Sequence, residues 1–327
     1  MKVLVSGNMR AVLSSDYKFF FSAESGISAR WGVTIHDDPF MSPTPELIDI
    51  AISNRCNQNC YFCYRNSTPT GPLMSMNDFK FLIDQLNGTF QVAIGGGEPT
   101  QHPDFISMLE YASDSGIVPN YTTNGTNLTD EVLNASKRHC GAVAVSWNKD
   151  SHESIRKLVN EGIKTNIHFV VMQHTINEAL RLITDVENLN NLGVNAVVFL
   201  LHKAVGRGKL ADTPTGADTQ RLIRQALTGE APVGFDTCFT PLISHAEQVS
   251  EVSVPWTLLD FCEASRFSMF VDQNLVAQPC SFCTGQRFSS NLRKQSLRDI
   301  WFGHKFDDFR ALLKEDKCAC PAIVRDV

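Results

Sequence analysis

The sequence predicts an α/β fold: a partial (β/α)6 barrel of the TIM type, followed by a small cysteine-rich auxiliary module. Apolar runs with strand character recur at regular spacing between residues 47 and 201. Segments with helical periodicity lie between these runs, and several begin with Ser, Thr, Asp or Asn caps. Six of the ten cysteines lie after the last run. Near-continuously apolar strands that alternate with helices form parallel sheets covered by helices, and six units favour an open barrel.

We divide the chain into three parts, residues 1–45, 46–205 and 206–327. The first contains aromatic runs around Phe19–Phe21 and Trp31, interrupted by Gly26, which are typical of short hairpin strands. The barrel strands are expected at residues 47–53, 91–94, 118–122, 143–146, 167–171 and 196–201. The helices between them are expected at residues 76–86, 105–113, 130–136, 151–159 and 176–192. After residue 201 the alternation stops, and a second module is expected.

Composition narrows the class of protein. The 327 residues are 43% hydrophobic and 20% charged, which supports a sizeable core. A net charge of -6 argues against broad electrostatic capture of nucleic acid. The chain has no run of eighteen apolar residues and no secretory segment, so we expect a cytoplasmic protein. Ten cysteines in a reducing compartment favour metal ligation over disulfides.

The first motif is a compact loop of three cysteines, Cys56, Cys60 and Cys63, directly after the first barrel strand. The carboxyl ends of barrel strands carry the chemistry of such folds, so these thiols are expected at the functional face. A three-thiolate loop holds three irons of a 4Fe-4S cluster and leaves the fourth iron for another ligand. The alternative is half of a zinc site, completed by His36, His102 or a remote cysteine.

The second motif is Gly95-Gly96-Gly97-Glu98-Pro99 at the end of the second strand. Its spacing is not that of a dinucleotide fingerprint. Glycines let a bulky ligand approach the backbone, and Glu98 is suited to accept a hydrogen bond from a ligand amine.

Together these motifs resemble those of the radical SAM superfamily, with Cys-x3-Cys-x-aromatic-Cys after strand one and Gly-Gly-Glu-Pro after strand two. The similarity continues in His102-Pro103-Asp104-Phe105 and Thr123-Asn124-Gly125 and covers about residues 46–205. The resemblance implies a radical enzyme with a 4Fe-4S cluster. It also implies reductive cleavage of S-adenosylmethionine to a 5'-deoxyadenosyl radical, which abstracts hydrogen from a substrate.

The resemblance also implies cofactor-binding residues. Phe62 would pack near the adenine, and the backbone of Gly95, Gly96 and Gly97 would hold the methionine amino group beside Glu98. Asn124 follows strand three within the family pattern, and Ser146 would contact the methionine carboxylate or the ribose. The family often has Ser-x-Asp after strand four, where this chain has Asn148 in place of the aspartate.

The C-terminal cysteines resemble the auxiliary-cluster modules called SPASM or twitch domains. Six cysteines predict one auxiliary 4Fe-4S cluster, because two fully cysteine-ligated clusters would need about eight cysteine ligands. Its favoured ligands are Cys238, Cys262, Cys280 and Cys320, with Cys283 and Cys318 as substitutes. A structural zinc site in the tail is the alternative. Cys140 stands apart and is expected to be a small core residue.

Substrate contacts are expected from His168 in the fifth strand and from Lys203 and Arg207 in the glycine-rich loop after the sixth. The alternative interpretation is that these cations lie on a solvated loop.

The resemblance favours a peptide or protein side chain as substrate and an electron donor such as flavodoxin or ferredoxin. Other readings are radical modification of a nucleotide, nucleic acid or small molecule, with Lys209 also on phosphate, and a non-catalytic zinc or iron-sulfur scaffold. No catalytic side chain is assigned.

Overall fold

The computed structural model describes residues 1–249, 253–254, 259–283 and 285–315. Cys318 and Cys320 lie outside the described residues. Within the described part of the chain, no helix is long and apolar enough to cross a membrane.

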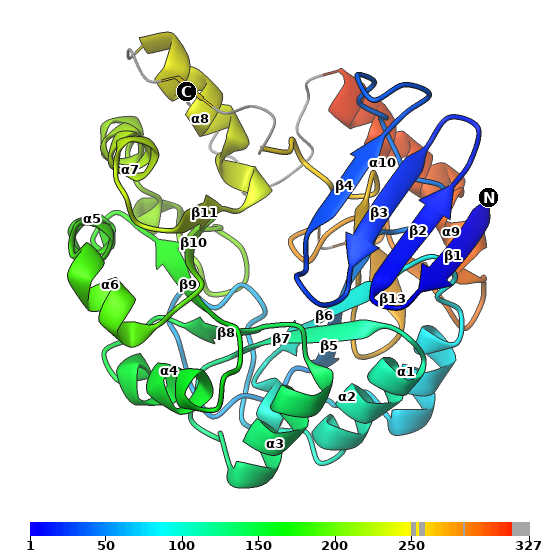
Figure 1. The fold of residues 1–327 in the computed structure, drawn as a ribbon, viewed down its shortest axis with the longest axis horizontal. Coiled ribbons are helices and arrows are strands. Elements are labelled where there is room, and N and C mark those ends of the chain that lie inside the picture. Colours follow the sequence, from blue (N-terminus) through cyan, green and yellow to red (C-terminus); the bar gives the residue numbers. More distant parts are fainter. Residues whose placement is uncertain (250–252, 255–258, 284, 316–327) are drawn as a thin grey trace.

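A curved parallel sheet forms the centre of the molecule (Figure 1). Its main strands pair in chain order: β5 (Leu47–Ser53), β6 (Gln91–Gly96), β7 (Val118–Thr123), β8 (Val143–Ser146), β9 (Thr165–Val171) and β10 (Ala196–Leu201). Helices cover its outer face: α1 (Met76–Ile83), α2 (Phe105–Asp114), α3 (Asp130–His139), α4 (Ser151–Asn160), α5 (Ile176–Thr184), α6 (Val186–Leu192) and α7 (Gly216–Thr228). The predicted α/β partial barrel is confirmed.

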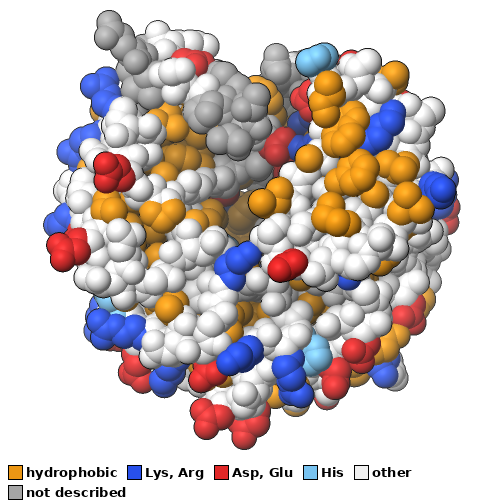
Figure 2. All heavy atoms as spheres, viewed as in Figure 1, with side chains coloured by type: hydrophobic (Ala, Val, Ile, Leu, Met, Phe, Trp, Pro, Cys, Tyr) orange, Lys and Arg blue, Asp and Glu red, His pale blue; other side chains and the backbone are white. Residues whose placement is uncertain are grey.

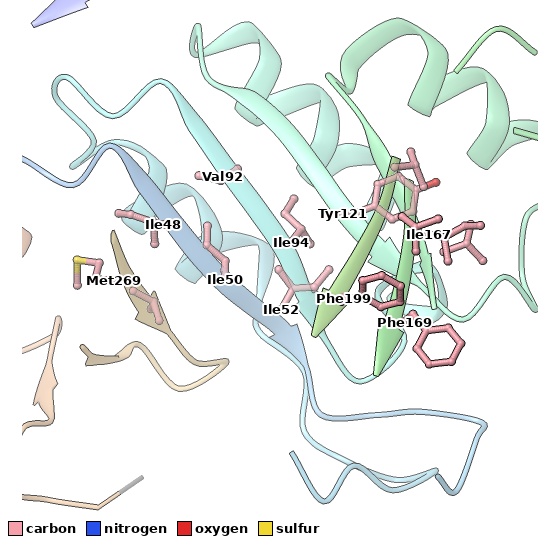
Figure 3. Packing of buried hydrophobic residues seen from close by; sticks show 14 of the residues in the cluster. Ile48, Ile50, Ile52, Val92, Ile94, Tyr121, Ile167, Phe169, Phe199 and Met269 are labelled. Atoms are coloured by element: carbon pink, nitrogen blue, oxygen red, sulfur yellow. The ribbon is translucent and has the colours of Figure 1, made fainter. Parts of the chain in front are cut away.

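The strands form because every second side chain enters the layer between sheet and helices. Ile48, Ile50 and Ile52 of β5 are all fully buried there, beside Val92 and Ile94 of β6 (Figure 3). Each such side chain contributes about 1.5–3 kcal/mol on burial. The alternate residues of each strand point to the inner face of the barrel, where several of them remain half-buried.

The sheet extends beyond the expected six strands. A short strand, β11 (Val233–Phe235), adds in parallel to β10, and β12 (Ser268–Val271) adds in parallel to β5. Both come from the segment in which the sequence predicted no further barrel strand, because runs of three and four residues are too short to stand out. Two small antiparallel strands, β13 (Val276–Gln278) and β14 (Ser290–Asn291), continue from β12. Helices α8 (Thr240–Val249), α9 (Leu297–Trp301) and α10 (His304–Lys314) complete this region.

The sequence predicted one continuous helix over residues 176–192, and this prediction is wrong. The structure has two helices, α5 and α6, which meet at Asp185. The Asp185 side chain accepts a hydrogen bond from the Asn188 backbone N–H at 3.1 Å, so it caps a new helix instead of continuing the old one.

The N-terminal residues form an antiparallel sheet, as the sequence predicts, from β1 (Lys2–Ser6), β2 (Met9–Leu13), β3 (Lys18–Ser22) and β4 (Ser28–Trp31). Its inner face packs Phe19 and Phe21 against Phe90 and Phe267 of the barrel region. Its outer face carries exposed apolar side chains, which gather at the upper right of Figure 2.

Candidate functional site

The three-cysteine loop leaves the carboxyl end of β5 and folds back on itself. The Cys56 N–H donates to the Thr68 carbonyl at 2.9 Å, and the Cys63 N–H donates to the Cys60 carbonyl at 3.2 Å. All three cysteines are half-buried free thiols. The predicted location of these thiols at the carboxyl-end face of the barrel therefore agrees with the fold.

The surroundings of two of the thiols disfavour their ionised form. Burial raises the pKa of Cys56 and Cys60, and the neighbouring thiols add to the effect. For Cys60, the Arg207 cation opposes part of this rise. A metal centre binds the ionised form and displaces the thiol protons, so the feature that suits this loop to a metal centre is that it carries three thiols.

The glycine run at the end of β6 lets two backbones come into contact. A Cβ at Gly96 would lie 2.0 Å from the Ser53 carbonyl oxygen, and one at Gly97 would lie 2.0 Å from the Arg55 carbonyl oxygen. Gly96 also has a φ of +113°, which favours glycine. The Gly97 N–H donates to the Ser53 carbonyl at 2.7 Å. These two glycines therefore seat the cysteine loop on β6, whereas a Cβ at Gly95 would meet open space.

Glu98 is buried and joins the ends of β6 and β7. Its carboxylate accepts hydrogen bonds from Thr100 Oγ1 and Thr123 Oγ1, each at 2.7 Å, and from the Asn124 N–H at 2.6 Å. The Thr100 N–H adds a fourth bond at 3.2 Å. Burial raises the pKa of Glu98, and these donors offset part of the rise. Protein donors thus occupy the carboxylate that the sequence assigned to a ligand amine.

Asn124 connects this network to the cysteine loop. Its Nδ2 donates to Asn57 Oδ1 at 3.0 Å and lies 3.8 Å from Cys56 Sγ. Asn148 instead serves a local turn, because its Oδ1 accepts the Asp150 N–H at 2.8 Å and its Nδ2 donates to the Ser146 carbonyl at 3.2 Å.

Ser146 and His168 lie side by side on the inner face of the sheet, paired in register on β8 and β9. His168 Nδ1 lies 3.3 Å from Thr122 Oγ1 of β7. Burial lowers the pKa of His168 to about 4, so its ring is neutral at pH 7. A neutral imidazole on the inner face offers one donor and one acceptor to a ligand.

The cations after β10 do not form an open patch. Lys203 has 4% of its side chain exposed and pairs with Asp236, and its ammonium lies 4.7 Å from the centre of the Phe282 ring. Arg207 donates from Nε to the Cys60 carbonyl at 2.9 Å and from Nη1 to the Ser67 carbonyl at 2.8 Å. Of these three side chains, Lys209 alone is exposed.

His102 is not available as a fourth ligand of the cysteine loop. Its Nε2 lies 2.8 Å from the Met74 carbonyl oxygen, and its Nδ1 accepts the Asp104 N–H at 3.0 Å. Both ring nitrogens of this buried side chain are therefore engaged. His36, the other candidate for a half-zinc site, is exposed in the segment after β4.

Three of the four described C-terminal cysteines pack together. Cys283 belongs to a small buried cluster with Phe288 and Phe309, and Cys262 and Cys280 pack against it. Cys238 packs against the main core beside Lys203. Within the described residues, no three His, Cys, Asp or Glu side chains lie close enough together to hold a single metal ion.

Two residues near the site were not singled out from the sequence. Asp49 is the one charged residue in the apolar run of β5, and it alternates with the buried isoleucines, so it faces the inside of the barrel. Burial raises its pKa to about 7, and the charge of Glu263 adds to this. Tyr64, next to Cys63, packs against Phe282 of the C-terminal region with the two rings tilted. The charge within an apolar strand was a visible cue for Asp49, whereas nothing in the sequence pairs Tyr64 with Phe282.

Comparison with known proteins identifies the family. The sequence model of the Radical SAM superfamily matches residues 50–200, which contain the cysteine loop and the glycine run. The chain belongs to the radical SAM superfamily. Among its relatives in this comparison is the AdoMet-dependent heme synthase of Methanosarcina barkeri, 26% identical over 293 residues, covering 80% of this chain and 83% of that protein. The mycofactocin maturase MftC of Mycobacterium tuberculosis is 39% identical over 80 residues, 24% of this chain and 20% of that one.

Solved structures share the fold of this radical SAM enzyme. Streptococcus suis SuiB bound to the precursor peptide SuiA matches with a TM-score of 0.76 and 15% identity, covering 95% of this chain and 91% of that one. The enzyme anSMEcpe with bound AdoMet and the Cp18Cys peptide matches with a TM-score of 0.62 and 15% identity, over 82% and 83% of the two chains. Radical SAM membership implies a 4Fe-4S cluster and S-adenosylmethionine.

The residues present fit these cofactors. Three half-buried thiols lie on one loop at the carboxyl-end face of the sheet, and each supplies a sulfur ligand once a metal displaces its proton. Gly95, beside the loop, leaves room where a side chain would stand.

Proposed function

We propose that this enzyme cleaves S-adenosylmethionine reductively at a 4Fe-4S cluster held by Cys56, Cys60 and Cys63, and abstracts hydrogen from a peptide or protein side chain. The observation that carries the proposal is the fixed loop of three half-buried thiols at the carboxyl end of β5. When bound, the cluster supplies the electron that cleaves the sulfonium and yields the 5'-deoxyadenosyl radical.

The chain's own residues position these groups. Glu98 and Asn124 tie the ends of β6 and β7 to the cysteine loop, so the loop and the glycine run are held in one geometry. Gly95 gives S-adenosylmethionine access to the backbone of β6. Phe62, half-buried beside Tyr61 with ring centres 5.1 Å apart, supplies an apolar surface for the adenine.

The inner face of the sheet forms the substrate site. It presents His168 of β9 and Asp49 of β5, which are half-buried and polar, while Ser146 beside His168 is the proposed contact to the carboxylate or ribose of S-adenosylmethionine. Their hydrogen-bonding groups orient a substrate carbon toward the radical, while the surrounding strands exclude water.

A peptide substrate is supported by the fold likeness to SuiB and anSMEcpe, whose structures contain bound peptides. A small-molecule substrate is the second candidate, because the similarity to the heme synthase runs over 80% of this chain. A flavodoxin or ferredoxin is the proposed electron donor. Incubation with candidate peptides and with porphyrins, followed by mass spectrometry, separates the two substrate classes.

An auxiliary 4Fe-4S cluster is proposed for the C-terminal region. Cys262, Cys280 and Cys283 supply three of its ligands, because all three belong to one small packed cluster. The fourth ligand is Cys238 or one of the two cysteines outside the described residues. Cys283 is thus proposed as a ligand, whereas the sequence analysis named it only as a substitute. Iron analysis of C283S tests it, since a loss of about four irons per chain is expected and an unchanged content contradicts it.

The experiment that tests the proposed function is anaerobic reconstitution followed by reduction with dithionite. The unsubstituted enzyme should bind iron and release 5'-deoxyadenosine from S-adenosylmethionine, and C60S should release none. C140S is the matched control, because Cys140 lies at the end of α3, where burial raises its pKa to about 12. A colourless zinc protein that forms no nucleoside would contradict the proposal and favour a non-catalytic scaffold.

A further inference from the structure

Arg207 crosses from the loop after β10 to the cysteine loop and binds it at several points. Its backbone N–H donates to the Cys63 carbonyl at 3.0 Å. Its Nε donates to the Cys60 carbonyl at 2.9 Å, and its Nη1 donates to the Ser67 carbonyl at 2.8 Å. One residue thus holds both ends of the Cys60–Cys63 segment and the chain that follows it.

The neighbouring glycine makes this contact possible. Gly206 has a φ of +64°, and a Cβ there would lie 2.3 Å from the Tyr64 carbonyl oxygen and 2.6 Å from that of Cys63. The two loops therefore touch backbone to backbone, and a side chain at position 206 would force them apart.

The charge of Arg207 has no carboxylate partner in the described part of the chain. No ion pair with an acidic side chain forms there, and its buried Nη2 makes no hydrogen bond to the residues that the structure describes. A guanidinium held by neutral carbonyls keeps its full field. That field acts on the cysteine loop, where three thiolates and an iron-sulfur cluster would carry net negative charge.

We propose that Arg207 is a positioning residue of the radical cluster: it fixes the Cys60–Cys63 segment through its hydrogen bonds and stabilises the reduced cluster through its charge. This inference rests on the proposed cluster at Cys56, Cys60 and Cys63. It replaces the expected contact of Arg207 with substrate, since the donors that would bind a substrate anion are directed at the loop.

The two roles of Arg207 are separable by substitution. R207Q removes the charge, and R207K keeps the charge but loses the forked geometry. K209Q is the control, because Lys209 lies on the same loop and is exposed.

The test uses the full chain after anaerobic reconstitution and follows two quantities: iron release to an excess of chelator, and the midpoint potential by EPR-monitored titration. Outer-shell partners typically change metal affinity about 10–100-fold. R207Q should therefore lose iron at least about tenfold faster and have a more negative potential. R207K should lose iron faster with a potential near that of the unsubstituted enzyme, and K209Q should match the unsubstituted enzyme in both.

R207Q and K209Q with equal potentials and equal iron release would overturn the inference. If R207Q does not fold, as judged by circular dichroism of the cluster-free chain, R207K decides: iron release at the unsubstituted rate overturns the inference. Substrate binding gives a further readout, because a loss of substrate affinity with normal uncoupled cleavage would restore the substrate role and overturn this one. Failure of the unsubstituted enzyme to assemble a cluster would instead count against the proposed function.

Discussion

The rings of Tyr64 and Phe282 lie with their centres 4.6 Å apart and their planes inclined at 55°. Tyr64 follows Cys63 in the first cysteine loop, and Phe282 precedes Cys283 in the C-terminal region. Two cysteine segments that are far apart in the sequence therefore meet through adjacent aromatic residues. Lys203 lies over the same Phe282 ring, so the loop after β10 joins the contact.

Loss of the Phe282 ring should weaken the attachment of the C-terminal region to the barrel. F282L keeps an apolar side chain but removes the aromatic and cation–π contacts, which together contribute on the order of 1 kcal/mol. The free energy of unfolding in urea should fall by about that amount. F81L is the control, because Phe81 is 44% exposed. Equal unfolding free energies for the two variants would contradict this role of Phe282.

Asp49 should make the protein less stable as the pH rises. Burial raises its folded pKa to about 7, above the value of about 3.9 expected in the unfolded chain. The folded state therefore binds the extra proton, and the contribution to stability is complete below pH 4 and lost as the pH rises to 7. D49N should be more stable than the unsubstituted protein at pH 8, by roughly 2 kcal/mol after allowance for partial exposure, and equal to it near pH 4.

Urea unfolding at the two pH values measures this difference for D49N. D114N is the control, because Asp114 is exposed at the end of α2. A D49N protein whose advantage is the same at both pH values would show that the carboxyl does not titrate in this range.

The contribution of His168 to stability changes with pH in the opposite direction to that of Asp49. Its folded pKa of about 4 is below the value of about 6.5 in the unfolded chain, so the unfolded state binds more protons between these values. Stability due to His168 is present above pH 6.5 and is lost as the pH falls to 4. H168Q should therefore lose less stability than the unsubstituted protein between pH 7 and pH 5 in thermal melts. Parallel pH curves for the two proteins would refute this.

The Lys203–Asp236 pair should matter more than a surface pair. Only 4% of the Lys203 side chain and 19% of the Asp236 side chain are exposed, so D236N leaves a buried cation without its anion. We expect a loss of about 3 kcal/mol in unfolding free energy. The control is E153Q, which breaks the exposed pair with Lys157 at 2.9 Å and should cost about 0.5 kcal/mol or less. Equal losses of unfolding free energy in D236N and E153Q would mean that water screens the charge of Lys203, which would contradict this prediction.

The barrel could be predicted from the sequence because the pattern of apolar residues that defines each strand lies within a few consecutive residues. The run Leu47–Ser53 is apolar at every position that enters the helix-covered layer, and the other main strands follow the same pattern apart from Thr123 of β7 and Thr165 of β9. The break at Asp185 was missed because an aspartate fits a helical pattern and a cap equally well until its hydrogen bond is seen.

The site was harder to predict, because side-chain partners come from distant parts of the chain. The position of the three cysteines follows from the strand before them. The partners of Glu98 and Arg207, in contrast, depend on how β7 and the loop after β10 approach β6 and the cysteine loop. A sequence shows that these side chains are polar or charged. It does not show that their hydrogen-bonding groups are already paired with carbonyls and hydroxyls of the protein.

The most direct test of the central claim asks whether S-adenosylmethionine binds an iron of the cluster at Cys56, Cys60 and Cys63. Electron–nuclear double resonance of the reduced enzyme, with the methionine amino group labelled with nitrogen-15, measures this. We predict a nitrogen-15 coupling in the unsubstituted enzyme and in C140S, and none in C60S. A reduced cluster that shows no coupling in the unsubstituted enzyme, with S-adenosylmethionine bound, would contradict the account.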